Sequence, residues 1–408
     1  MIRGRCMAFS LVILMATSTL ATAQSPGERL RTELEAGRAG QAVAALRPLA
    51  ATDPEARMAL GFAQFMHSVE RLVQGLHRYG LKSPTNPFLP IIRVPVPTNR
   101  QAEALDYSKL RALYQTLLDD LAATRATLAA IPSSSAKIVL DLNAVKINPG
   151  SVVTGPQNAM GLRDVIGAMG GRTGANGAAA SWEVAFDYSD TLWLAGYSHV
   201  LSAMIEFVMA HDWEKTYDAT AHLFFDGARP PKDFLPAAPL DAMNAMGGGV
   251  ADQIAFLHLM QWPAGDKVRM SAARGHLKSM IATSRQTWKA VLAETDDDRE
   301  WLPSPTQHSR AVPSLPITAD MVESWHKVLD EFDALLDGRA LLAHWRFKKG
   351  IDLKMFFEEP KPFDLVLAIT GHGMTPFLKD GPVLDGTAWS RWNGLFRSNF
   401  LGYAFFIN

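Results

Sequence analysis

An acidic run near residue 300 holds the side chains best suited to chemistry. Residues 294–300 read Glu-Thr-Asp-Asp-Asp-Arg-Glu, so five carboxylates lie within seven residues and repel one another. The run follows a predicted long helix, whose C-terminal end also disfavours negative charge. Ca²⁺ binds carboxylate oxygens, and the alternating spacing of Asp296, Asp298 and Glu300 is typical of loops that supply such ligands. The sequence therefore predicts that something positive compensates the run, with Ca²⁺ as one hypothesis.

Basic side chains are the other hypothesis for this compensation. The EF-hand pattern fails, because Trp301 stands where that loop needs glycine and Gln307 where it needs glutamate. A salt-bridged or solvated acidic turn needs no metal ion. Its partners would be Arg299 itself or basic residues from elsewhere, such as Arg310, Arg346 and Lys348.

Catalytic carboxylates are a third interpretation of the run, and they would need a partner. The candidates are Asp297 together with His344 or His372. His372 lies between Gly371 and Gly373, so its imidazole is expected on a tight turn, a place where active-site loops often lie. A turn that only connects one strand to the next can also read Gly-His-Gly. No Gly-x-Ser-x-Gly elbow is present. This interpretation predicts a hydrolase or a metal-dependent enzyme.

A polar core pair is predicted in the apolar segment 192–210. His199 and Glu206 are seven residues apart, so both lie on one face of a helix. A buried charge needs a partner. The pair predicts either a metal or acid–base site, which would need a third ligand from elsewhere, or two groups satisfied by hydrogen bonds between helices.

The same segment is long enough to span a membrane. Glu206 opposes that interpretation, and aspartates flank the segment where Lys or Arg would set an orientation. We therefore expect the central helix of a globular domain, begun by Ser189 and Asp190, and no transmembrane span in the mature chain.

The first 23 residues have the pattern of a signal peptide. Arg3 and Arg5 precede an apolar run, and residues 21–23 read Ala-Thr-Ala before Gln24. We expect export to the periplasm or secretion, which would remove the single cysteine, Cys6, and leave no thiol. The mature chain would hold 38 basic and 41 acidic side chains, a formal net charge of −3. That balance favours neither nucleic acid nor an anionic membrane as a partner.

The elements expected around these residues make a mainly α fold, a helical bundle with a minor β-sheet near the C-terminus. Apolar spacing and caps predict the long helices 53–79, 106–130, 192–210, 266–294 and 319–336, with shorter ones at 26–36, 41–49, 214–225 and 240–260. Segment 137–147 favours a strand, as do 341–347, 351–357 and 363–369.

Residues 37–63 resemble a tetratricopeptide-type helical hairpin. The resemblance rests on small residues that let helices approach, and on a proline that closes the unit: Gly37, Ala42, Ala45, Pro54, Leu60, Gly61 and Ala63. These residues carry a resemblance that extends over about 50 residues of the N-terminal helices, with no second copy. It implies a helix pair within a larger core and says nothing about a ligand.

Four regions follow from these patterns. They are the signal peptide 1–23, an N-terminal helical region 24–135, a region 136–180 with an ambiguous strand and a Gly/Ala-rich linker, and a domain 181–408 that holds all ten tryptophans. We expect a binding or accessory protein for a glycan, peptide or protein ligand, because tryptophan suits such grooves. The alternative is a periplasmic hydrolase or metal-dependent enzyme that uses the 294–300 carboxylates with a C-terminal histidine.

Overall fold

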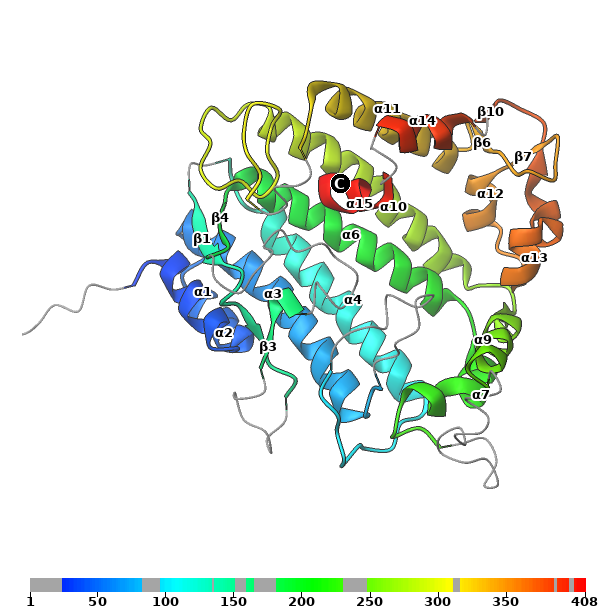
Figure 1. Cartoon of the computed structure of the whole chain (residues 1–408), viewed down its shortest axis with the longest axis horizontal. Coiled ribbons are helices and arrows are strands. Elements are labelled where there is room, and N and C mark those ends of the chain that lie inside the picture. The colour runs from blue at the N-terminus through cyan, green and yellow to red at the C-terminus, as the bar shows by residue number, and fades with distance from the viewer. Residues whose placement is uncertain are drawn as a thin grey trace, which may run out of the picture.

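A computed structural model (Figure 1) describes residues 24–82, 96–133, 136–150, 159–164, 181–229, 248–310, 316–384, 387–395 and 400–408. The expected signal peptide 1–23 and residues 165–180 of the Gly/Ala-rich linker lie outside the described residues. The fold is mainly helical with small sheets, as the sequence predicts.

Four long helices lie side by side through the middle of the molecule. They are α3 (Pro54–Arg78), α4 (Tyr107–Ala129), α6 (Tyr188–Ala210) and α10 (Lys267–Val291), and each packs against the next in that order. Each begins in the same way, with an aspartate whose carboxylate accepts hydrogen bonds from backbone N–H groups of the first turn. These caps are Asp53, Asp106, Asp187 and Asp266. The caps explain why apolar spacing locates these helices to within a few residues.

Helix α6 is, within the described part of the chain, the one helix long and apolar enough to cross a membrane. It lies between α4 and α10 (Figure 1), and its neighbours satisfy its polar groups. Arg125 of α4 donates to the backbone oxygen of Ser198 and to the hydroxyl of Ser202, and both serines are fully buried.

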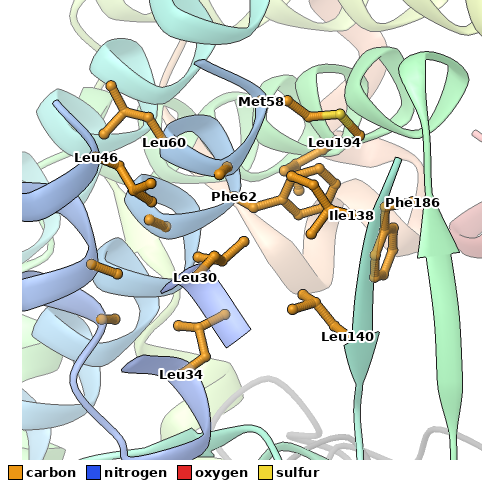
Figure 2. Packing of buried hydrophobic residues seen from close by; sticks show 14 of the residues in the cluster. Leu30, Leu34, Leu46, Met58, Leu60, Phe62, Ile138, Leu140, Phe186 and Leu194 are labelled. Carbon is orange, nitrogen blue, oxygen red and sulfur yellow. The ribbon is translucent and has the colours of Figure 1, made fainter. Parts of the chain in front are cut away.

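The N-terminal helices and a small sheet form one apolar core (Figure 2). Helices α1 (Pro26–Glu35) and α2 (Ala39–Leu46) pack on α3, while β1 (Ile138–Asp141) pairs antiparallel with β4 (Glu183–Phe186). Trp182 also lies in this core. Residues on both sides of the region 136–180 therefore share one core. Strands β2 (Lys146–Ile147) and β3 (Met160–Gly161) form a second short pair.

The last helix closes over the centre of the molecule. Helix α15 (Phe400–Ile407) lies against α6 and α10 (Figure 1). The indole N–H of Trp193 donates to the Phe406 oxygen, and that of fully buried Trp288 to the Ile407 oxygen, each at 2.9 Å. Two tryptophans therefore fix the carbonyl groups at the end of this helix.

The remaining elements lie along α10 or at the end of the molecule where α10 begins (Figure 1). They are α7 (Glu214–Phe224), α9 (Gly248–Leu259), β5 (Gln261–Trp262), α11 (Ala319–Leu336), β6 (Leu341–Leu342), β7 (Gly350–Ile351), α12 (Leu353–Glu358), β8 (Phe363–Asp364), α13 (Leu365–Thr370), the 3₁₀ helix η3 (His372–Phe377), β9 (Leu378–Lys379), β10 (Val383–Leu384) and α14 (Thr387–Leu395). A four-stranded sheet has the order β10-β6-β7-β9, and β5 pairs with β8.

The strands predicted at 341–347, 351–357 and 363–369 are much shorter than the sequence suggests. Each keeps two strand residues at most, and the second and third segments are mainly the helices α12 and α13. The reason is local. Asp352 and Asp364 accept hydrogen bonds from the backbone N–H groups of Met355 and Leu367, which starts a helix in the middle of each apolar run.

Candidate functional site: a buried carboxylate cluster

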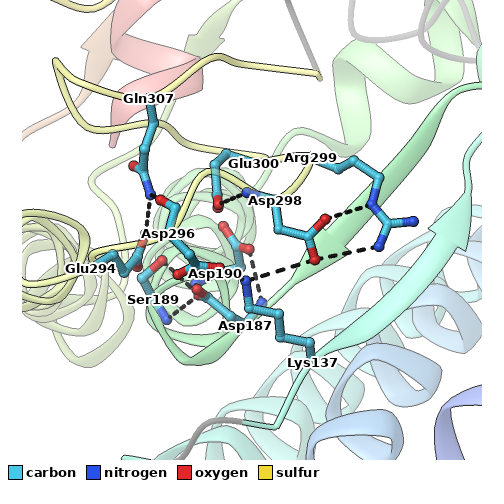
Figure 3. A network of polar contacts seen from close by, with 10 residues as sticks. All are labelled: Lys137, Asp187, Ser189, Asp190, Glu294, Asp296, Asp298, Arg299, Glu300 and Gln307. Carbon is cyan, nitrogen blue, oxygen red and sulfur yellow. Dashed lines mark hydrogen bonds and ion pairs between the residues drawn. The ribbon is translucent and has the colours of Figure 1, made fainter.

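Four carboxylates from three chain segments meet beside the start of α6 (Figure 3). Asp187 and Asp190 begin α6, Glu294 follows the end of α10, and Glu300 lies in the turn beyond it. One oxygen each from Asp187, Glu294 and Glu300 can be chosen so that all three lie within 4.8 Å of one another. Asp187, Asp190 and Glu300 are buried, and Glu294 is half-buried. We call these four residues the carboxylate cluster.

The capping of α6 positions the two aspartates. Asp187 Oδ1 accepts hydrogen bonds of 2.8 Å from both the backbone N–H and the hydroxyl of Ser189. Asp190 Oδ2 accepts from the Asp187 backbone N–H at 3.1 Å, which completes a capping box. The second oxygen, Asp190 Oδ1, is buried and has no hydrogen-bond partner, although its side chain lies among the other carboxylates (Figure 3).

The turn after α10 brings in the two glutamates. Gln307 Nε2 donates to Glu294 Oε2 at 3.3 Å, and Glu300 Oε1 accepts the Asp298 backbone N–H at 2.8 Å. Between them, Arg299 has φ of 58°, the one non-glycine residue with positive φ among the described residues. Such a conformation is strained for a side chain with a Cβ. It is held because the Arg299 oxygen accepts the backbone N–H of Ala185 in β4 at 3.1 Å.

Burial and mutual repulsion change the protonation of the cluster. Burial, together with the nearby Asp187 charge, raises the pKa of Asp190 well above its usual range. The same two causes raise the pKa of Glu294 to about 7. Burial also raises the pKa of Glu300. At neutral pH the cluster must therefore hold protons, or a cation must take their place.

Of the three residues predicted to bind Ca²⁺, the structure places Glu300 in the cluster and the other two outside it. Asp296 forms an ion pair with Lys137. Asp298 accepts from Arg299 Nε at 2.9 Å, and this hydrogen bond lowers its pKa. In Figure 3, Arg299 lies beside Asp298, while Lys137 extends toward Asp296 and the buried carboxylates. The Lys137 charge partly opposes the effect of burial on the pKa of Glu300. Basic side chains therefore compensate Asp296 and Asp298, whereas a cation bound by the cluster would compensate Glu300.

The candidate catalytic residues lie apart from one another. Asp297 pairs with exposed His308 at 2.6 Å, and this contact lowers the pKa of Asp297. His344 Nε2 lies 3.3 Å from the Ile369 oxygen, and His372 begins η3. Both histidines belong to the end of the molecule that carries β6 and α13, at the far side of Figure 1 from β4 and the cluster. The structure does not bring either histidine to Asp297.

The polar core pair on α6 has two separate sets of partners on α10. The Nδ1 atoms of His199 and His276 are 2.9 Å apart, so one ring must donate and the other accept. Burial and the Arg125 charge lower the pKa of each imidazole to about 4. Glu206 forms an ion pair with Arg269 at 2.8 Å. These contacts satisfy both members of the pair without a metal ion.

Most tryptophans in the described part of the chain contribute to the core. Trp182, Trp288, Trp325 and Trp392 are buried, and several others pack against the apolar clusters. Trp345 is the exception, with 75% of its surface exposed. The tryptophan content therefore reflects packing far more than a binding groove.

Sequence reasoning missed Asp187 and Asp190 as site residues, and it included Glu294 only as one of the 294–300 carboxylates. Asp190 was predicted only as a cap, and a separation of 104 positions in the sequence hides its proximity to Glu294. Comparisons with known family models, curated proteins and solved structures found no match. The function of the cluster must therefore be argued from its own geometry.

Proposed function

We propose that the carboxylate cluster binds a hard divalent cation, Ca²⁺ in the first place, and that this ion stabilises an exported binding or accessory protein. The observation that carries the proposal is the convergence of Asp187, Glu294 and Glu300 with oxygens within 4.8 Å of one another. The unpartnered Asp190 Oδ1 beside them adds a fourth oxygen that lacks a donor.

The donor set favours Ca²⁺ over other ions. All the side-chain donors are oxygens, which hard cations prefer, whereas Zn²⁺ and Cu²⁺ sites are richer in nitrogen and sulfur. Two ligands on opposite sides of Ca²⁺ lie about 4.8 Å apart, twice its usual ~2.4 Å bond length. The three carboxylate oxygens all lie within that span of one another. Mg²⁺ demands a near-ideal octahedron and usually keeps several waters, whereas Ca²⁺ accepts an irregular set of carboxylate oxygens.

The ion would act as a clamp between distant parts of the chain. The cluster joins the start of α6 to the end of α10, and the turn that carries Glu300 is bonded to β4 through Arg299 and Ala185. Without a cation, repulsion among the carboxylates opposes this arrangement. With a bound cation, the same carboxylates attract the ion and hold these parts of the chain together.

The wider role is the one expected from the sequence. We propose export to the periplasm or outside, no transmembrane span and no nucleic-acid partner, with a glycan, peptide or protein as ligand. The helices α2 and α3 would form the tetratricopeptide-like pair, supported by the close approach at Gly40 of α2, where a Cβ would lie 3.0 Å from Cε1 of His67 on α3. The small C-terminal sheet would complete the larger domain.

A hydrolase remains the alternative, and one observation favours it. A carboxyl with a pKa of about 7, as at Glu294, suits general acid–base catalysis at neutral pH. The pairing with His344 or His372 finds no support in the arrangement, because both lie at the other end of the molecule (Figure 1).

Thermal unfolding with and without calcium tests the proposal. At a hundred times its dissociation constant, Ca²⁺ should add about 2.7 kcal/mol to the free energy of unfolding. Glu300→Gln should abolish this gain, and the matched double variant Asp296→Asn/Asp298→Asn should keep it, because those two carboxylates lie outside the cluster.

Two results would contradict the proposal. One is an identical melting curve of the parent protein in calcium and in chelator. The other is loss of the calcium effect in the Asp296→Asn/Asp298→Asn variant but not in Glu300→Gln, which would place the ion on the outer turn. Equilibrium dialysis of the parent protein against ⁴⁵Ca²⁺ gives an independent measurement if Glu300→Gln fails to fold.

A further inference from the structure

Large apolar side chains that face solvent are concentrated at one end of the molecule. Eight of the thirteen in the described part of the chain lie in only two stretches, 254–257 and 342–383. Six of the eight concern us here: Ile254 and Leu257 on α9, Trp345 after β6, and Val366, Leu367 and Ile369 on α13. We call these six residues the apolar edge. Trp345, Ile369 and Ile254 are 75%, 65% and 62% exposed.

Contacts between the elements show that the apolar edge is continuous. Helix α13 packs against α9, and the backbone N–H of Leu365 donates to the Met260 oxygen at 3.0 Å. His344 links α13 to the loop after β6, because its Nε2 lies 3.3 Å from the Ile369 oxygen. Its ring stacks on Trp345 with centroids 5.6 Å apart. In Figure 1, α9 and α13 lie one above the other at the edge of the molecule.

Basic side chains flank the apolar edge. The Arg346 guanidinium lies 4.6 Å from the centre of the Trp345 ring. Arg346, Lys348 and Lys361 are exposed, and none forms an ion pair with a carboxylate of the described residues. Two of the nearby acids are already engaged, since Asp364 caps α13 and Asp380 pairs with Lys349, whereas Glu359 is exposed two residues before Lys361.

We propose that the apolar edge is a docking surface for an anionic membrane. Aliphatic side chains beside an exposed tryptophan and unpaired cations are typical of helices that lie in the headgroup region of a bilayer. The nearly balanced net charge does not oppose this, because electrostatic attraction to lipid acts within about a Debye length and depends on the local cations. The chain would then bind at the surface without spanning it.

A second copy of the chain fits the same surface less well. A symmetric dimer through the apolar edge would place Arg346 and Lys348 of one copy near those of the other. Like charges at a desolvated interface oppose association. An anionic headgroup layer instead supplies the opposite charge along the whole flank.

Cosedimentation of the purified protein with vesicles, in chelator, tests this proposal independently of the calcium site. We expect binding to vesicles containing 30% phosphatidylglycerol and much weaker binding to pure phosphatidylcholine. Arg346→Glu/Lys348→Glu should weaken partitioning by more than about thirtyfold, because the loss of two surface cations alone accounts for that factor and the new carboxylates repel the lipid. The control Arg47→Glu/Lys289→Glu changes as many exposed cations elsewhere and should bind like the parent. Ile369→Asp should also weaken binding, and Leu49→Asp, an exposed site on the N-terminal side, should not.

Three outcomes would overturn the proposal. The first is no binding to either vesicle. The second is equal weakening by the Arg47→Glu/Lys289→Glu control, which would indicate an effect of net charge alone. The third is a dimer in sedimentation velocity that Ile369→Asp dissociates, which would assign the apolar edge to a second copy.

Discussion

Replacement of Glu294 by glutamine should remove part of the pH dependence of the free energy of unfolding. In the folded protein the Glu294 pKa is raised to about 7, from 4.5 in an ordinary environment, first by burial and then by the Asp187 charge. Between these two pH values the unfolded chain releases its proton while the folded protein retains it. Stability in the absence of metal therefore falls as the pH rises through this window and levels off above it.

The size of the effect follows from the shift. At 1.36 kcal/mol for each tenfold change in proton affinity, and with a reduction because Glu294 is only half-buried and partly screened by solvent, the rise of its pKa corresponds to about 2 kcal/mol. Glutamine has nearly the same shape and keeps an oxygen to accept from Gln307 Nε2, but it carries no charge. In chelator, Glu294→Gln should gain about 2 kcal/mol over the parent on going from pH 5 to pH 8. For a chain of this length that is a change of about 2–3 °C in melting temperature.

Differential scanning calorimetry at pH 5 and pH 8 measures this change. Exposed Glu359, changed to glutamine, serves as the matched control and should behave like the parent at both pH values. The reasoning is refuted if the stability difference between Glu294→Gln and the parent is the same at both pH values. With calcium at pH 8 the order should invert, because the glutamine variant has lost a ligand.

Further predictions concern export, the α6 ion pair and the histidine pair. Protein recovered from the cell envelope should begin at Gln24 and contain no thiol by titration, whereas retention of Cys6 would show an uncleaved segment. Glu206→Leu should cost about 1–3 kcal/mol in urea unfolding, since it leaves the half-buried Arg269 without its carboxylate, and an unchanged midpoint would contradict this. The pKa of both His199 and His276 is lowered from 6.5 to about 4, so the unfolded chain binds protons first and stability should fall as the pH drops between these values. His276→Gln should flatten that acid limb in pH-dependent unfolding, and an unaltered slope would show that the pair does not titrate in this range.

The sequence alone predicts the helices well, because their signals are local. Apolar spacing, together with aspartate caps at α3, α4, α6 and α10 and a threonine cap at α11, locates these helices. The same kind of signal was overlooked at Asp352 and Asp364, where alternating apolar residues suggested strands. In such short segments apolar periodicity does not distinguish a strand from a helix, and the aspartate cap decides in favour of the helix.

The composition of the acidic run determined that its charges need compensation, but not how each is compensated. That choice depends on Lys137, which lies 159 residues before Asp296, and on Asp187 and Asp190 at the start of a distant helix. Only tertiary packing decides which carboxylate of the run is buried. The strained turn at Arg299 directs Glu300 inward and leaves Asp298 with the basic side chains. The sequence gives the number of carboxylates in the run. Their protonation depends on burial and on neighbouring charges, and folding alone sets the distances that determine these two effects.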